Sequence, residues 1–320
     1  MKALASLLGA AALAGTVLFA PAAGAQTIHL VVPFAPGGAQ DVLGRHFATK
    51  LSARMGTPVV VDNKSGASGV VAADGVAKAV PDGTTLFLAT GGAITIAPHL
   101  NPKLSYDALK DFVPVALIGD TPMTLSVRAQ SPYQTIADVL RDAKANPGKV
   151  SYGSSGNGSV SHLTGELLAQ AAGVQLIHVG YRGASPALID LLGGQISMMV
   201  TSSASIDPMV QEKKARVLAT FTRDNLPNFP GVPTVTQSSG LKGLEVPVWI
   251  GIMAPARTPA ATVEKLAAEF TAVCRLPETQ ERFKSLGALA MCGGPAELEK
   301  VVADDYQRWA RVIKQGNIKE

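Results

Sequence analysis

The sequence contains few aromatic, charged, cysteine and histidine residues, and each shortage argues against a class of function. Of its 320 residues, 5% are aromatic and 16% are charged, and the formal net charge is +4 with no basic cluster. A base-stacking surface for nucleic acid is therefore not expected, and the mild positive balance suits a small anion better than a polyanion. The five histidines lack the spacing of zinc ligands, so no metal site is expected.

Motifs for cofactor binding and catalysis are also missing. The sequence has no Walker A motif, and the Gly-Ser-Ser-Gly at 153–156 lacks one spacer of the Gly-x-Ser-x-Gly hydrolase motif. The segment 156–161 approaches a dinucleotide-binding fingerprint, but a serine stands where its third glycine or alanine belongs. We therefore expect no cofactor and no enzyme activity. The alternative is an exported α/β hydrolase that uses Ser154, Ser155 or Ser159.

The first 25 residues are typical of a secretory signal peptide. Lys2 precedes an uncharged, mostly apolar run over 3–20, Pro21 breaks that run, and Ala-Gly-Ala at 23–25 offers the small-x-small pattern that signal peptidase cleaves. The alternative is a transmembrane anchor, which needs about 20 apolar residues. We expect cleavage before Gln26 and a periplasmic mature protein, because no later segment reaches membrane-spanning length without charge, glycine or proline.

The two cysteines, Cys274 and Cys292, lie close together near the C-terminus. In an oxidising compartment such a pair is expected to form a disulfide. Closing so short a loop contributes about 3 kcal/mol to stability. The alternative is a pair of unbridged, buried thiols.

Short apolar runs alternate with helical patterns along the chain. Runs at 28–32, 58–62 and 86–89 are rich in apolar residues and end near glycine-containing turns, and helical patterns cover 40–55 and 70–80. Repeats of strand, turn and helix predict βαβ units on a mostly parallel sheet. The fold class predicted from this pattern is α/β.

The alternation is repeated further along the chain, and the C-terminal part is helical. Additional strands are expected at 113–118, 124–127, 148–152, 176–179, 197–200, 216–221 and 249–252, with helices near 136–143, 163–171, 186–192, 260–275, 278–286 and 295–313. Two sets of strands imply two lobes. We expect the chain to cross near residue 125 and return near residue 225, so that lobe 1 comprises 26–124 and 225–320 and lobe 2 comprises 125–224.

Loops rich in glycine, serine and threonine follow several of the strands. They are 35–39, 65–69, 90–92, 154–159 and 201–203. Ligands of open α/β sheets bind outside the carboxyl ends of the strands, where helix N-termini present unpaired N–H groups and a positive dipole end. Each loop alone is explained equally well as turn geometry. Their recurrence on both sheets predicts a carboxylate site built from backbone and hydroxyl groups.

At these loops the chain resembles the Bug/TctC family, the extracytoplasmic binding subunits of tripartite tricarboxylate transporters. The matching segments are 32–38 with Asp41 and Arg45, 62–67, 81–86, 152–159 with 162–163, 181–183 with 186–188, 190–194, and 249–251 with 254–255. They cover almost all of the predicted mature chain in order. Ser65 and Ser68 depart from the proline and glycine that the family often has there.

The resemblance implies a two-lobed fold like that of type II periplasmic binding proteins, with crossing hinge strands and closure around the ligand. It further implies a monomer that captures a small organic carboxylate and delivers it to the membrane subunits of a tripartite tricarboxylate transporter. A sensor or a different transporter is the alternative partner. No nucleic acid is expected to bind.

The resemblance also implies which residues contact the ligand. In lobe 1 they are Pro36, Gly37, Gly38, Ala39, Asp41, Ser65, Gly66, Ala67, Ser68, Thr90, Gly91 and Gly92. In lobe 2 they are Ser154, Ser155, Gly158, Ser159, His162, Tyr181, Thr201 and Ser202. Two roles stay open from the residues alone. Asp41 is most simply a dipole-matched helix residue, and His162 is as well explained as an ordinary residue of a helix N-terminus.

Overall fold

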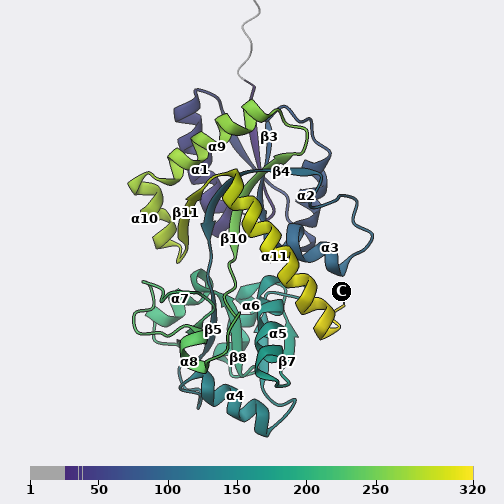
Figure 1. Cartoon of the computed structure of the whole chain (residues 1–320). Coiled ribbons are helices and arrows are strands. Elements are labelled where there is room, and N and C mark those ends of the chain that lie inside the picture. The colour runs from purple at the N-terminus through teal and green to yellow at the C-terminus, as the bar shows by residue number, and fades with distance from the viewer. Residues whose placement is uncertain (1–25, 35, 38, 320) are drawn as a thin grey trace, which may run out of the picture.

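The structure is a computed structural model that describes residues 26–34, 36–37 and 39–319. Within these residues the chain forms two lobes, each built on its own sheet with helices around it (Figure 1). The predicted signal peptide and Gly38 lie outside the described residues. Across the described part, no helix has the length and apolar character needed to span a membrane.

Lobe 1 contains a six-stranded sheet. In spatial order its strands are β11 (Leu289–Gly293), β4 (Phe112–Asp120), β10 (Trp249–Pro255), β3 (Thr85–Thr90), β1 (Ile28–Val32) and β2 (Val59–Asn63). Strand β1 runs parallel to β2 and β3, whereas β10 is antiparallel to β3 and β4. The parallel strands are those that the βαβ pattern predicts, and the returning strand β10 makes the sheet mixed.

Helices cover both faces of this sheet. They are α1 (Ala39–Met55), η1 (Ala67–Gly69), α2 (Val70–Ala77), η2 (Gly92–Ile96), α3 (Ala97–Leu100), α9 (Ala260–Cys274) and α10 (Pro277–Ser285), of which η1 is a 3₁₀ turn and η2 a π-helix. Strand β3 shows why two layers are needed. Its Leu86 and Leu88 join the core under α1 and α9, and its Phe87 and Ala89 join the core under α2, because successive strand residues point to opposite faces.

Lobe 2 contains a five-stranded sheet. In spatial order its strands are β7 (Ile177–Gly180), β6 (Ser151–Ser154), β8 (Met198–Ser202), β5 (Met123–Arg128) and β9 (Ala215–Thr220). Its helices are α4 (Ile136–Ala145), α5 (Val160–Ala172), α6 (Ala184–Leu192), α7 (Ser203–Gln211) and α8 (Val235–Ser239). The predicted helix near 136–143 is present, with Thr135 as its cap: the Thr135 side chain accepts the Asp138 N–H, and the helix buries Ile136 and Val139.

Two chain segments cross between the lobes, and the second lies later than predicted. Strand β4 continues into β5 close to the predicted residue 125, but the return to lobe 1 occurs at Trp249 instead of near residue 225. Leu226 and Phe229 pack beside α6 and α7 in lobe 2. The Pro- and Asn-rich composition of 225–233 suggested a connector, but these two apolar side chains anchor it to lobe 2.

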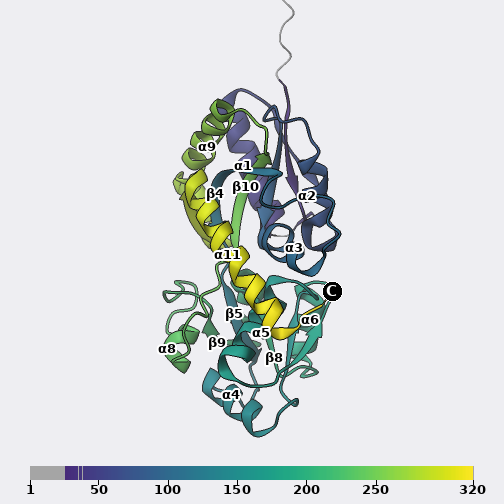
Figure 2. The ribbon, with the colours of Figure 1, turned by 45° about the vertical axis from the view of Figure 1, so that its right-hand side comes forward.

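The C-terminal helix α11 (Pro295–Gly316) contributes to the cores of both lobes. The prediction that all of 225–320 belongs to lobe 1 is therefore wrong for the second half of α11. Leu298 and Val302 pack in the core of lobe 1, whereas Trp309 and Val312 pack in the core of lobe 2. Figure 2 shows α11 running from the flank of one lobe down to the other. The lobes are therefore joined by a continuous helix as well as by the crossing segments.

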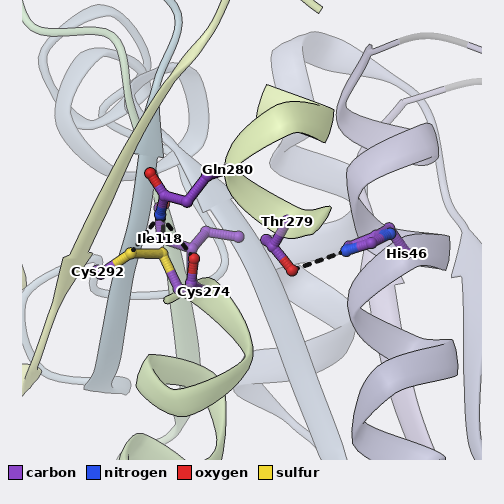
Figure 3. Close-up of a disulfide and its surroundings, with 6 residues drawn as sticks. All are labelled: His46, Ile118, Cys274, Thr279, Gln280 and Cys292. Carbon is purple, nitrogen blue, oxygen red and sulfur yellow. Dashed lines mark hydrogen bonds between the residues drawn. A yellow bond between two sulfur atoms is a disulfide. The ribbon is translucent and has the colours of Figure 1, made fainter. Parts of the chain in front are cut away.

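The two cysteines form a disulfide at one edge of lobe 1 (Figure 3). It joins Cys274 at the end of α9 to Cys292 on the edge strand β11, and Gln280 donates a 2.7 Å hydrogen bond to the Cys274 carbonyl oxygen. The bridge thus fixes α10 and the following strand to the end of α9.

Candidate functional site

The glycine-rich loops after β1, β2 and β3 meet at the carboxyl end of the lobe 1 sheet. A β-carbon added at Gly69 would lie 3.2 Å from Pro33 Cβ and 3.4 Å from Ala93 Cβ. One added at Gly92 would lie only 2.6 Å from the backbone oxygen of Ser68, which a real β-carbon does not tolerate. The loops at 65–69 and 90–92 therefore touch, and glycine allows that approach.

The loop 65–69 is held in an uncommon backbone conformation. Ala67 and Ser68 have positive φ angles of 44° and 53°, between Gly66 and Gly69, which also have positive φ. Such angles cost conformational energy in residues with a β-carbon and persist only where surroundings impose them. The side chains from 65 to 68 are exposed, as are Pro36 and Gly37, whereas Ala39 is partly buried.

Asp41 braces the loops after β1 and β2. Its carboxylate is 2% exposed and accepts hydrogen bonds from the Gly37 N–H at 2.9 Å, from Asn63 Nδ2 at 2.8 Å and from Arg45 Nε at 3.1 Å. Burial raises the pKa of this carboxyl, but the bonds from Arg45, Gly37 and Asn63 outweigh burial and hold the pKa below its usual value. Asp41 therefore holds the loops after β1 and β2 together through its hydrogen bonds.

Ser161, which is not among the predicted ligand contacts, organises the loop after β6. Ser161 is 3% exposed, and its Oγ accepts the Ser155 N–H at 3.0 Å and lies 3.0 Å from both the Ser155 and the Ser159 hydroxyls. Ser159 caps α5 by accepting the His162 N–H at 3.2 Å. The only sign of Ser161 in the sequence was that it stood in place of glycine in a nucleotide-binding pattern.

His162 supports the same loop from beneath. The Gly158 N–H donates to His162 Nδ1 at 3.1 Å, so the imidazole proton resides on Nε2. The ring stacks on His178 with centroids 3.8 Å apart, and the His178 ring nitrogen lies 2.6 Å from the Ser154 hydroxyl. Burial lowers the pKa of both imidazoles to about 4, so both are neutral at pH 7.

The remaining predicted residues of lobe 2 lie at the same edge of its sheet. Strands β6 and β8 are parallel neighbours, which brings the loop after Ser154 level with Thr201 and Ser202. Thr201 is buried, and the Ser202 hydroxyl pairs with Ser205 at 2.9 Å. The Tyr181 hydroxyl donates to Asp190 at 2.7 Å. The Ser202 and Tyr181 hydroxyls thus have protein partners of their own.

The loops of the two lobes approach each other at the start of α5. A β-carbon at Gly91 would lie 3.6 Å from Val160 Cγ2, and one at Gly158 would lie 2.9 Å from Leu100 Cδ1. The first pair joins the loop after β3 to the first residue of α5, and the second joins α3 to the loop before α5. The predicted segment 90–92 therefore contacts the start of α5, and the predicted segment 154–159 contacts the end of α3.

A surface hollow of about 420 Å³ lies elsewhere, at the C-terminal end of α5. Glu166, Gln170 and Gly316 are among the residues that line it, and none of the predicted ligand contacts is among them. Over the described residues, no group of three or more His, Cys, Asp or Glu side chains is placed to hold a metal ion. The converging loops are therefore the candidate site.

The sequence matches a known family over most of its length. The model of the tripartite tricarboxylate transporter family receptor matches residues 43–318. Protein BugT of Bordetella pertussis is 32% identical over 296 residues, covering 92% of this chain and 90% of BugT.

Solved structures are similar over nearly the whole described chain. Rpa4515 of R. palustris with adipate has a TM-score of 0.82 and 33% identity, covering 92% of this chain and 98% of that one. MatC from Rhodopseudomonas palustris with bound malate has a TM-score of 0.79 and 33% identity, covering 90% and 98%. With the two-lobed α/β architecture and the family match over most of its length, the chain belongs to the Bug/TctC family of solute-binding receptors.

Proposed function

We propose that this protein captures a small organic carboxylate between its lobes and delivers it to the membrane subunits of a tripartite tricarboxylate transporter. The observation that carries the proposal is the meeting of the Gly91 loop of lobe 1 with the first residue of α5 in lobe 2. Relatives with adipate and malate support the ligand class. The protein acts as a monomer in the periplasm after its signal peptide is removed.

Neutral donors suit this ligand. The helix N-terminus at Ser159 and the hydroxyl-rich loop before it offer N–H and O–H groups, and the two neighbouring imidazoles are uncharged. Since a hydrogen bond to a charged group contributes about 1.5–3 kcal/mol, several such bonds are needed to offset the cost of association and leave the ~8 kcal/mol of a micromolar complex. The helix dipole adds about 0.3–1 kcal/mol for an anion at its N-terminus.

The predicted contacts divide into two roles in this proposal. Direct contacts come from the backbone and hydroxyl groups of 36–39, 65–68, 90–92 and 155–159, whereas the buried Ser154 hydroxyl pairs with His178. Asp41, Ser161 and His162 hold these loops in place through the hydrogen bonds described above. Tyr181, Thr201 and Ser202 line the edge of the site from lobe 2.

A hydrolase is the alternative function, because Ser154 Oγ lies 2.6 Å from a ring nitrogen of His178. A serine nucleophile needs a base at that distance, an orienting group behind the base, and access to substrate. The Ser154 side chain is 0% exposed, and among the described residues no carboxylate bonds to His178. This geometry favours the binding protein. Turnover of a p-nitrophenyl ester that is abolished by Ser154→Ala would favour the hydrolase.

Calorimetric titration of refolded, ligand-free protein tests the proposed ligand class. Adipate, malate and a panel of other organic acids are compared with hexane-1,6-diol and hexane-1,6-diamine, which match adipate in length but carry no carboxylate. We expect at least one acid to bind with a Kd on the order of micromolar and the diol and diamine not to bind. Absence of binding across the acids, or equal binding of the diol, contradicts the proposal.

Delivery to the transporter is tested in the host. Deleting the gene is expected to abolish uptake of the labelled acid that the purified protein binds, and expression of the wild-type chain is expected to restore it. Unchanged uptake in the deletion strain contradicts the transport role while leaving ligand capture in place.

A further inference from the structure

A buried carboxylate lies in the middle of the helix that joins the two lobes. Asp305 is 1% exposed, and its Oδ2 accepts hydrogen bonds from Thr95 Oγ1 at 2.7 Å and Trp249 Nε1 at 3.1 Å. Its Oδ1 accepts from Arg308 at 3.0 Å. The carboxylate therefore ties α11 to η2 on one side and to the first residue of β10 on the other.

The bond to Thr95 leads directly to the candidate ligand loop. The Thr95 hydroxyl is fully buried and also lies 3.0 Å from the Gly91 backbone oxygen. Gly91 packs so closely here that an added β-carbon would lie 3.1 Å from Thr95 Oγ1 and 3.3 Å from Asp305 Oδ2. The Thr95 hydroxyl thus lies between the Asp305 carboxylate and the Gly91 carbonyl group.

The bond to Trp249 leads to the hinge. Trp249 begins β10, and the residue before it, Val248, donates its N–H to Asp120 at the end of β4 with a distance of 2.8 Å. The crossing segment after β4 and the one before β10 are therefore hydrogen-bonded to each other, next to the residue that contacts Asp305. Because α11 also packs Trp309 into the core of lobe 2, Asp305 lies where hinge, ligand loop and spanning helix meet.

Stability alone does not account for a carboxylate at this position. Burial raises the pKa of Asp305, which reflects the cost of holding its charge away from water. Replacing buried charged groups by apolar side chains of similar size is often neutral or stabilising. What the carboxylate supplies, and an apolar residue does not, is directional bonding to Thr95 and Trp249.

From this geometry we infer that Asp305 is a positioning residue for ligand capture, which fixes the Gly91 loop through Thr95 and the start of β10 through Trp249. The inference rests on the proposed function, because it concerns the loop that is proposed to contact the carboxylate. It adds a residue far from the sequence-predicted loops and outside every glycine-rich segment.

Matched variants at Thr95 and Asp305 test the inference. Thr95→Val removes the bridging hydroxyl with little change in volume, and Thr95→Ser retains it. Asp305→Asn removes the charge and one acceptor, and Asp304→Asn is a control on the exposed side of the same helix. For each variant, the Kd of the acid that binds wild type tightest is measured by calorimetry, and folding is checked by thermal unfolding. Hydrogen exchange of the peptide spanning 88–96 reports on the loop itself.

We expect Thr95→Val and Asp305→Asn each to weaken binding about tenfold, as loss of one well-placed hydrogen bond does. Thr95→Ser and Asp304→Asn should bind within about twofold of wild type, and the double variant should be no weaker than the singles because both act on one path. Exchange over 88–96 should accelerate in Thr95→Val and not in Thr95→Ser. If one variant fails to fold, the other decides.

Equal binding by wild type, Thr95→Val and Asp305→Asn overturns the inference and leaves the proposed function intact. Weakened binding in Thr95→Ser to the same degree as in Thr95→Val also overturns it, because the hydroxyl would then not matter. Failure of wild type to bind any acid overturns the proposed function, and the inference with it.

Discussion

Gly92 lies against the backbone oxygen of Ser68, at a distance that leaves no space for a side chain on Gly92. The contact joins the loop after β2 to the π-helix after β3. π-Helical turns are rare in proteins, but those that occur are often found at functional sites. Here one directly follows the candidate ligand loop. The loop after β2 and the start of the π-helix are therefore packed directly against each other beside the candidate site.

Gly92→Ala is expected to disrupt this contact. The new methyl group would overlap a backbone atom that has no rotamer to move into, so we expect a loss of about 1–3 kcal/mol in the free energy of unfolding. Carboxylate binding should weaken at least about tenfold. Chemical denaturation and calorimetry measure the two effects. The matched control is Gly75→Ala in helix α2, where the nearest atom is 3.8 Å from the added β-carbon and a slight stabilisation is expected. Equal effects at both glycines would refute the steric explanation.

Asp41→Asn should destabilise the protein in a pH-dependent way. The folded-state pKa of Asp41 lies below its usual value of 3.8, so its contribution is fully present above pH 4 and is lost as the pH falls through the folded pKa. We expect a loss of about 1.5–3 kcal/mol at pH 7, which is the range for hydrogen bonds to a charged group. Denaturation of wild type and variant from pH 7 to pH 2 measures it. A difference that stays constant down to pH 2 contradicts the prediction.

The stacked histidines should make the protein sensitive to mild acid. Burial lowers the pKa of His162 and His178 from 6.5 to about 4, so the unfolded chain takes up protons first as the pH falls. The stability that they contribute is present above about pH 6.5 and is lost toward pH 4, at up to about 1.4 kcal/mol per pH unit for each histidine. Denaturation at closely spaced pH values, with NMR titration of the ring protons, measures both quantities.

His178→Gln provides the comparison for that titration, because it removes one of the two imidazoles and should reduce the pH slope. His29→Gln is the control. His29 is exposed and lies beside Asp62 in lobe 1, whereas the stacked histidines are in lobe 2. If the ring protons of His162 titrate near pH 6.5, burial in the stack does not lower the pKa of this imidazole, and the prediction is wrong.

Ser161→Ala should weaken binding without unfolding the protein. The variant leaves the Ser155 N–H without its acceptor and frees two hydroxyls, so the loop before α5 loses its shape. We expect a rise of about tenfold in Kd and a loss of about 1–2 kcal/mol in stability. Ser185→Ala on the exposed face of α6 is the control and should match wild type in both measurements. Wild-type affinity in Ser161→Ala would remove this serine from the site.

Removing the disulfide should destabilise lobe 1. The bridge closes a loop with a sequence separation of 18 residues, for which the chain-entropy estimate is about 3 kcal/mol. Replacing both cysteines by serine, or reducing the bridge, is expected to lower the melting temperature and to speed hydrogen exchange in β11. An unchanged melting temperature after complete reduction, verified by thiol titration, contradicts this expectation.

Much of the fold was predictable because local pattern and global fold agree. The strand at 28–32 has three β-branched residues and is buried except at His29, and the helix after Thr135 has its cap and its apolar stripe at regular spacing. Composition misled where apolar residues sit among prolines, as at Leu226 and Phe229. The edge strand β11 was missed, since its five residues include two with no strong strand preference, Cys292 and Gly293.

The candidate site was predictable only in outline. Glycine-rich loops after strands mark the carboxyl edge of a sheet, and in the structure Gly91 lies against Val160 at the start of α5. The residues that position these loops give no such signal. Asp305 is more than 200 positions from Thr95 in sequence. The sequence around Thr95 and around Asp305 has no spacing or periodicity that predicts this hydrogen bond, because the bond depends on how α11 packs across both lobes.

The course of α11 also bears on how the chain folds. Trp309 and Val312 complete the interior of lobe 2, although the rest of that lobe is encoded before residue 249. A fragment that ends before residue 249 would lack these side chains and would expose apolar core residues of lobe 2, including leucine and valine, to solvent. Lobe 2 therefore cannot finish its core during synthesis until residues 309–313 have emerged, and it is unsuited to isolation as an autonomous piece.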